Sequence, residues 1–112
     1  MYNILSDLNK TSGVKGSMLV GQDGIIIAAD LDTQYEDETV GAMSASIVSS
    51  VGKAMERLKG EEPMQITVEA DHGKLFLANA GVGILTVLAD KEVNIGLIRL
   101  EMKNAISKIS GQ

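Results

Sequence analysis

The chain has 112 residues, no cysteine and a formal net charge of −5 at pH 7, and hydrophobic residues make up 45% of it. A chain of this length forms one domain, which we expect to span residues 1–112. The negative charge argues against nucleic acid or an anionic membrane as the main partner. The lack of cysteine excludes disulfide and thiol chemistry and fits a reducing compartment, so we expect a cytoplasmic protein.

Neither the N-terminus nor the apolar runs indicate a membrane segment. The first residues, "MYNILSDLNK", lack the basic stretch and long apolar run of a signal peptide. The longest apolar runs, "IIIAA" and "ILTVLA", are far too short to span a bilayer. The sequence therefore predicts no membrane insertion.

The N-terminal quarter of the chain predicts a short helix followed by a hairpin. Residues 3–12 place three apolar side chains on one helical face, namely Ile4, Leu5 and Leu8. Gly13 can adopt the left-handed conformation that ends such a helix. The strands "VKGSMLV" and "IIIAAD" then flank "GQDG", in which Asp23 and Gly24 form a typical hairpin turn.

A long helix follows the hairpin. Thr33 and Glu36 have the spacing of a capping box, so the helix is predicted to begin near Gln34, and Gly60 and Pro63 end it. The face predicted to pack on the sheet consists of Val40, Met43, Ile47, Val51, Ala54 and Leu58, widened by Val48 and Met55. Beside this face lies a strip made only of small residues, namely Gly41, Ala45 and Gly52.

The C-terminal half predicts three strands and a last helix. "MQITVEA" (residues 64–70) alternates strictly and predicts a half-buried strand, which "DHG" turns into "KLFLANA". "GVG" then leads into the strand "ILTVLAD". The last helix is expected from Asn94 to Ile109, with an apolar stripe of Ile95, Ile98, Met102, Ala105, Ile106 and Ile109.

The order of these elements predicts the fold class. Short strand connections favour an antiparallel sheet, and the two central strands carry apolar side chains on both faces. A sheet that is apolar on both faces needs cover on both faces. We expect an α+β sandwich with five antiparallel strands, the long helix on one face and the two terminal helices on the other.

No catalytic, metal or cofactor site is predicted. Gly52-Lys53 is followed by Ala54, where a phosphate-binding loop needs serine or threonine. The acidic run 30–38 has a tyrosine where a calcium loop needs glycine. His72, the only histidine, lies in a tight turn, and no nucleophile or base has an orienting partner. The sequence predicts a binding or regulatory module that is not an enzyme and uses no cofactor.

The small-residue strip of the long helix predicts self-association. Between Thr39 and Met55 the only charged residue is Lys53, whereas a soluble helix normally turns a charged face to water. Each interior glycine costs about 1 kcal/mol relative to alanine, which close approach of another helix would explain. We expect an identical helix from a second subunit, with the strand at 64–70 extending the sheet because its outer edge is unprotected. The alternative is a solvated surface that tolerates small residues.

Four segments together resemble the roadblock family, which contains dynein light chains and bacterial and archaeal regulators of small Ras-like GTPases. They are "GVKGSMLVGQDGIIIAAD", "VGAMSASIVSSVGKAMERLKGEE", "QITVEADHGKLFLANAG" and "ILTVLADKEVNIGLIRLEM", and in this order they cover nearly the whole chain. The resemblance implies a profilin-like sandwich and a homodimer that pairs the third strands and the long helices. The expected interface residues are Gly41, Ala45, Val48, Ser49, Gly52, Gln65, Ile66, Thr67, Val68 and Glu69.

The resemblance also implies a function. Roadblock dimers bind small GTPases, and some bacterial members stimulate GTP hydrolysis. Arg57 and Arg99 are the only arginines and are the candidates for an arginine finger, although a surface arginine is the simpler interpretation of each. The residues expected to contact a GTPase are Ser46, Ser50, Arg57, Leu97 and Leu100.

Two other functions remain open on the sequence alone. A small-ligand sensor would need polar groups that converge in an apolar cavity, for which Asn79 is the one candidate. A structural adaptor of the dynein light chain type would bind a peptide or partner subunit. For the GTPase regulator itself, both a true activator and a passive scaffold are compatible with the sequence.

Overall fold

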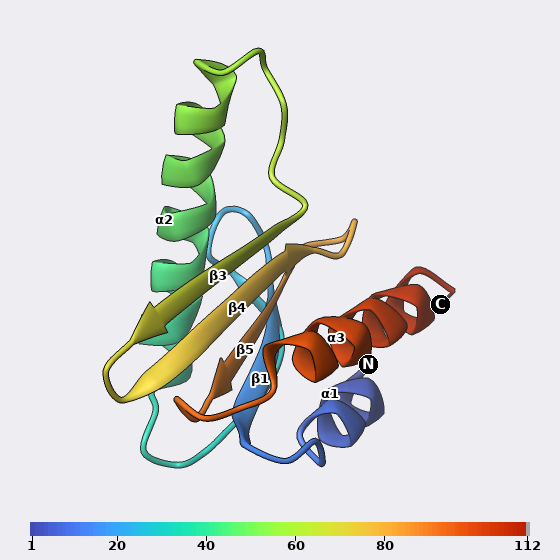
Figure 1. The fold of residues 1–112 in the computed structure, drawn as a ribbon. Coiled ribbons are helices and arrows are strands. Elements are labelled where there is room, and N and C mark those ends of the chain that lie inside the picture. The colour runs from blue at the N-terminus through green and yellow to red at the C-terminus, as the bar shows by residue number, and fades with distance from the viewer. Residues whose placement is uncertain (112) are drawn as a thin grey trace.

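The computed structural model describes residues 1–111. Its elements form one antiparallel sheet, in the strand order β2-β1-β5-β4-β3, with helices on both faces (Figure 1). No helix of residues 1–111 is both long and apolar enough to cross a membrane. The elements are α1 (Tyr2–Leu8), β1 (Val14–Val20), β2 (Ile26–Leu31), α2 (Asp37–Glu56), β3 (Gln65–Ala70), β4 (Gly73–Asn79), β5 (Ile84–Ala89) and α3 (Ile95–Ser110).

Alternation along the strands creates two separate cores. Phe76 of β4 packs with α1 and α3 on one face, whereas its neighbours Leu75 and Leu77 belong to the cluster under α2. Met18 and Leu19 of β1 divide between the faces in the same way. The predicted sandwich, with the long helix on one face and the terminal helices on the other, is confirmed.

The layer of α1 and α3 follows the predicted apolar stripes. Ile98, Met102, Ala105 and Ile109 of α3 are buried. The Asn94 side chain caps α3 by accepting a hydrogen bond from the Leu97 amide at 3.0 Å. Helix α1 is shorter than predicted because Asn9 leaves it. The side-chain carboxamide of Asn9 donates a hydrogen bond to the Asp30 carbonyl at 2.7 Å and accepts one from the Ser17 hydroxyl at 2.7 Å.

Two glycines of the first connections have the left-handed conformation that the sequence predicts, although Gly13 does not end α1, whose C-cap is Asn9. Gly13 has φ +90°, and a Cβ there would lie 2.9 Å from Cγ2 of Val93. Gly24 has φ +86° in the hairpin turn, which the Gly21 amide closes by donating to the Ile25 carbonyl at 2.8 Å. Both positions need the left-handed region that glycine occupies without strain.

The predicted start of α2 is wrong, because the chain forms a turn before the helix. The Tyr35 amide donates to the Asp32 carbonyl at 3.0 Å, and the Asp32 carboxylate accepts from the Thr33 amide at 3.1 Å. The helix begins only at Asp37, and Glu36 is its N-cap without a side-chain capping bond. The capping box expected between Thr33 and Glu36 is therefore absent.

The predicted sheet-facing side of α2 is right only in part, since Val40, Ile47 and Val48 belong to or pack against the cluster under α2 as expected. Met43 and Leu58 are 38% and 66% exposed, whereas Val40, Gly41 and Ser44 are buried. The centre of the buried face lies roughly 40° around the helix axis from the centre of the predicted face, at 3.6 residues per turn.

A polar anchor and a close approach explain this rotation. The Thr86 hydroxyl donates to the Ser44 hydroxyl at 3.0 Å, and Ser44 donates to the Val40 carbonyl at 2.8 Å. A Cβ at Gly41 would lie 3.4 Å from the Gly24 carbonyl and from a side chain of β1. Gly41 therefore belongs to the core of its own chain, which corrects its assignment to a subunit interface.

Candidate functional site

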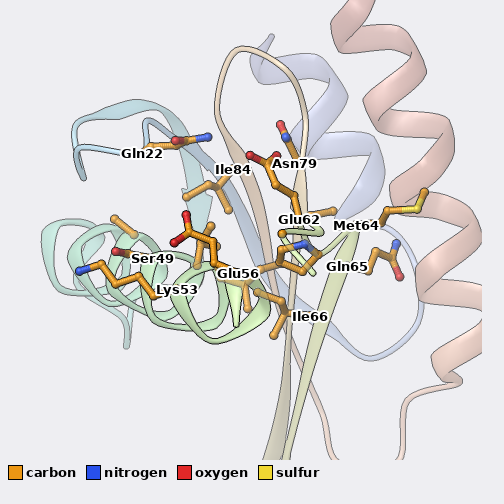
Figure 2. Close-up of a pocket in the computed structure, with 17 residues that line it drawn as sticks. Gln22, Ser49, Lys53, Glu56, Glu62, Met64, Gln65, Ile66, Asn79 and Ile84 are labelled. Carbon is orange, nitrogen blue, oxygen red and sulfur yellow. The ribbon is translucent and has the colours of Figure 1, made fainter. Parts of the chain in front are cut away.

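A groove of about 380 Å³ lies between α2 and the ends of the strands beside it (Figure 2). One wall is α2, and the floor carries aliphatic side chains of β3, β4 and β5, namely Ile66, Leu77, Ala78 and Ile84. The connection after α2 closes one end through Gly60, Glu62, Pro63 and Met64. The groove reaches the beginning of β3, an edge strand of the sheet, through Gln65 and Ile66.

The wall of the groove contains most of the α2 residues that the sequence assigned to an interface. Ala45, Val48, Ser49 and Gly52 all line it. No atom outside its own helical neighbourhood lies within 4 Å of the position where a Cβ of Gly52 would stand. Of the small-residue strip, Gly52 is therefore open to a second helix, Ala45 is half-buried and Gly41 is buried.

The edge of β3 lies next to this groove. Within residues 1–111, β3 pairs with β4 and with no other strand. Val68 is 40% exposed, so β3 is less buried than its alternating pattern predicts. The interface residues predicted on β3, Gln65–Glu69, consequently form one open edge whose backbone can pair with another strand.

The two faces of β3 can be assigned from its register. Ile66 and Val68 lie opposite Leu77 and Leu75 and face the α2 layer. Thr67 lies opposite Phe76 and faces the layer of α1 and α3. On that face the Arg99 guanidinium donates to the Thr67 hydroxyl at 3.1 Å.

The chemistry of the groove suits a protein surface better than a small ligand. Its floor is aliphatic, and its charged groups, Lys53, Glu56 and Glu62, lie around the rim. The carboxamide oxygen of Asn79 accepts from the Gly81 amide at 2.8 Å, so this oxygen is used within its own turn. Residues 1–111 contain no group of three or more histidine, aspartate or glutamate side chains placed to hold a metal ion.

The residues predicted to contact a GTPase lie in two separate places. Ser46 and Ser50 are exposed on α2 and Arg57 at its C-cap, whereas Leu97 and Leu100 lie on α3, on the opposite face of the sheet. The two leucines are 40% and 53% exposed, so they do not pack into the layer of terminal helices. The structure therefore does not unite the five residues into one surface.

Sequence reasoning missed the polar anchor under α2. Ser44 and Thr86 are fully buried, although both are residue types more common at surfaces. The available signal was the position of Ser44, one turn after Val40 on the same face, together with Thr86 in an otherwise apolar strand.

Comparison with known proteins identifies the family. A model of the Roadblock/LC7 domain matches residues 1–89. The chain belongs to the Roadblock/LC7 family. Three uncharacterised proteins of Methanocaldococcus jannaschii are each 43% identical to this roadblock chain over 106 residues. The alignments cover 95% of this chain and 93%, 93% and 90% of theirs.

Solved roadblock structures share the fold. The Roadblock/LC7 domain from Streptomyces avermitilis has a TM-score of 0.92 at 24% identity, covering 99% of this chain and 95% of that one. MglB from Myxococcus xanthus has a TM-score of 0.90 at 22% identity, with coverage of 98% and 91%. The gliding protein MglB from Thermus thermophilus has a TM-score of 0.84 at 15% identity, with coverage of 96% and 83%. These likenesses confirm the predicted roadblock fold.

Proposed function

We propose that this roadblock chain forms a homodimer through the groove and the β3 edge, and that the dimer binds a small Ras-like GTPase as a regulator or scaffold. The observation that carries the proposal is that two surfaces without a partner among residues 1–111 adjoin each other. The small-residue wall of α2 and the unpaired edge of β3 border the same opening. The chain acts as one domain over residues 1–112 and has no catalysis of its own in this proposal.

A second copy suits the groove in shape and in chemistry. A two-fold axis beside β3 would pair two β3 strands into one continuous sheet and bring the two α2 helices together across it. Gly52 and Ala45 allow close approach because nothing larger than a methyl group projects from them. A stable interface of this kind buries on the order of 1,600 Å² in total.

The GTPase enters the proposal through the family. Roadblock proteins, as the resemblance implies, include regulators of small Ras-like GTPases, and the fold matches MglB closely. The exposed side of α2 supports a docking role because Ser46 and Ser50 are small and uncharged, next to the exposed Met43 and a single charge, Lys53. Leu97 and Leu100 lie across the sheet from this side, so the proposed docking platform is α2 alone.

Dimerisation is tested first, by sedimentation of the wild-type chain at tens of micromolar. We expect a dimer, which Gly52→Leu converts largely to monomer because the leucine fills the groove. Ala54→Leu is the matched control, since Ala54 is exposed on the same helix and does not line the groove. A monomeric wild type, or equal effects of the two variants, would refute the interface.

GTPase binding is tested separately, by calorimetry against the small Ras-like GTPases of the same organism. We expect binding that depends on whether the GTPase carries a GTP analogue or GDP. Ser46→Glu and Ser50→Glu should each weaken it while leaving the dimer intact. Binding at wild-type affinity would refute the α2 platform, and no binding by any of these GTPases would favour the adaptor or ligand-sensor alternatives.

A further inference from the structure

Two charged groups that flank the open edge of β3 have no ion-pair partner among residues 1–111. Arg99 projects from α3 toward β3, where Thr67 accepts one of its hydrogen bonds at 3.1 Å. A guanidinium has five N–H donors, so one hydroxyl satisfies only part of it. The ion pairs in the described residues are Lys10–Asp7 and Lys15–Asp90, so Arg99 contacts no carboxylate among residues 1–111.

Glu69 is the acidic counterpart on the same face. It lies two residues after Thr67, and side chains alternate along a strand, so both project toward the α3 side. Its cross-strand neighbour is Lys74, whose ammonium group donates to the Lys91 carbonyl instead. Glu69 is exposed at the sheet edge and has no ion pair within residues 1–111.

Two-fold pairing of β3 allows only a few registers. Directly opposed residues in an antiparallel pair point to the same face of the sheet. A two-fold axis perpendicular to the sheet must therefore pass beside one residue of β3, and that residue lies opposite its own copy. The two central registers of Gln65–Ala70 place either Thr67 or Val68 on the axis. They differ in what lies opposite each Thr67.

The charges favour one of these registers. With Thr67 on the axis, the two threonines oppose each other and bring the two Arg99 guanidinium groups together, which is repulsive. With Val68 on the axis, Thr67 lies directly opposite the partner's Glu69, at a Cβ separation of about 5 Å. Since Thr67 already binds Arg99, this places the guanidinium beside the partner's carboxylate.

We propose that Arg99 forms an ion pair with the partner's Glu69 across paired β3 strands, and that the two pairs per dimer fix the register in which Val68 faces itself. The inference rests on the proposed homodimer and adds a specificity determinant to it. The pairs favour this chain as its own partner, because a dimer with a related chain lacking one of the charges loses one of the two pairs.

Charge exchange tests the contact. Arg99→Glu and Glu69→Arg should each raise the dimer dissociation constant about tenfold, because each replaces two attractive pairs with two repulsive ones. An equimolar mixture of the two variants should form heterodimers at close to wild-type affinity, since both pairs of the heterodimer then join opposite charges. Sedimentation and native mass spectrometry measure the affinity and the composition.

The mixture separates this inference from the proposed dimer. A monomeric wild type would refute the homodimer itself. A dimeric wild type whose variants associate normally, or whose mixture forms no preferred heterodimer, would overturn the ion pair. A contact of Arg99 within its own chain would not favour heterodimers. Preferred formation of the heterodimer would therefore also exclude a purely structural role of Arg99.

A cysteine pair reports the register independently. The chain has no cysteine, so Val68→Cys introduces one thiol per subunit. On the axis, the two Cα atoms lie about 5 Å apart, within the range of a disulfide. We expect Val68→Cys to form a cross-linked dimer on mild oxidation and Thr67→Cys to cross-link far less. The reverse order would overturn the proposed register.

Discussion

Replacing Ser44 with alanine should destabilise the chain more than its size suggests. Ser44 and Thr86 are fully buried, and the hydrogen bonds run in one direction, from Thr86 to Ser44 and from Ser44 to the Val40 carbonyl. Ser44→Ala removes the acceptor of the Thr86 hydroxyl and leaves that hydroxyl buried without a partner. Thr86→Val removes the donor instead, and Ser44 keeps its bond to Val40.

The two substitutions therefore have different expected costs. An unsatisfied buried hydroxyl costs about 1–3 kcal/mol, and the better helix propensity of alanine offsets roughly 0.5 kcal/mol. We expect Ser44→Ala to lower the free energy of unfolding by about 2 kcal/mol. Thr86→Val should cost under about 1 kcal/mol, because valine preserves the shape and leaves no unpaired donor.

Urea denaturation followed by circular dichroism measures these values, at one fixed protein concentration because dimerisation adds to stability. The double variant should be more stable than Ser44→Ala alone, since it removes the orphaned hydroxyl. If Ser44→Ala matches the wild type, or if Thr86→Val is the costlier change, the polar anchor does not stabilise α2 as described.

Three further predictions concern the loops and helix ends. Asn94→Ala should lower the free energy of unfolding by about 1 kcal/mol in the same assay, whereas Thr33→Ala should change it little, because Asn94 caps α3 and no capping box forms at α2. Gly13→Ala should destabilise by roughly 1–2 kcal/mol, from its positive φ and the valine methyl group 2.9 Å from its Cβ position; a neutral result would contradict that geometry. The Asp90 carboxylate, 3.1 Å away, raises the pKa of Lys15 above its ordinary 10.5, so the stability from this pair is present below pH 10.5 and lost as pH rises through the raised value. Asp90→Asn should lower that pKa in an NMR titration, and an unchanged pKa would refute this cause.

The fold was predictable because β3 and the last helix carry a clear period and because turn residues mark the ends of the other strands. The alternating pattern located β3 to within one residue, and the stripe through Ile98 and Met102 located the buried face of α3. Hydrophobicity was only a partial guide on α2, because Ser44 and Gly41 share the buried face with Val40, whereas the larger Met43 and Leu58 are exposed. Gly41 was assigned to an interface because a small residue indicates that another element approaches closely, but does not indicate which element.

The candidate site was predictable in part. The sequence assigned Ala45, Val48, Ser49 and Gly52 to an interface, and all four line the groove. Their use in a dimer stays a prediction. The sequence could not show how Leu97 and Leu100 relate to α2, because residues distant in the chain acquire their relative positions only from the sheet between them.

The anchoring of α2 is uneven along its length, and this bears on its motions. The buried residues of α2 lie in its first two turns, while Figure 1 shows its C-terminal half extending past the end of the sheet. Amide hydrogens after Ser49 should therefore exchange with solvent through local opening, at a lower free energy than those near Ser44. A partner that packs against Gly52 must first order this half of the helix. Part of the binding free energy is then spent on that ordering, and occupancy of the interface becomes visible as slower exchange in a segment that the isolated chain protects poorly.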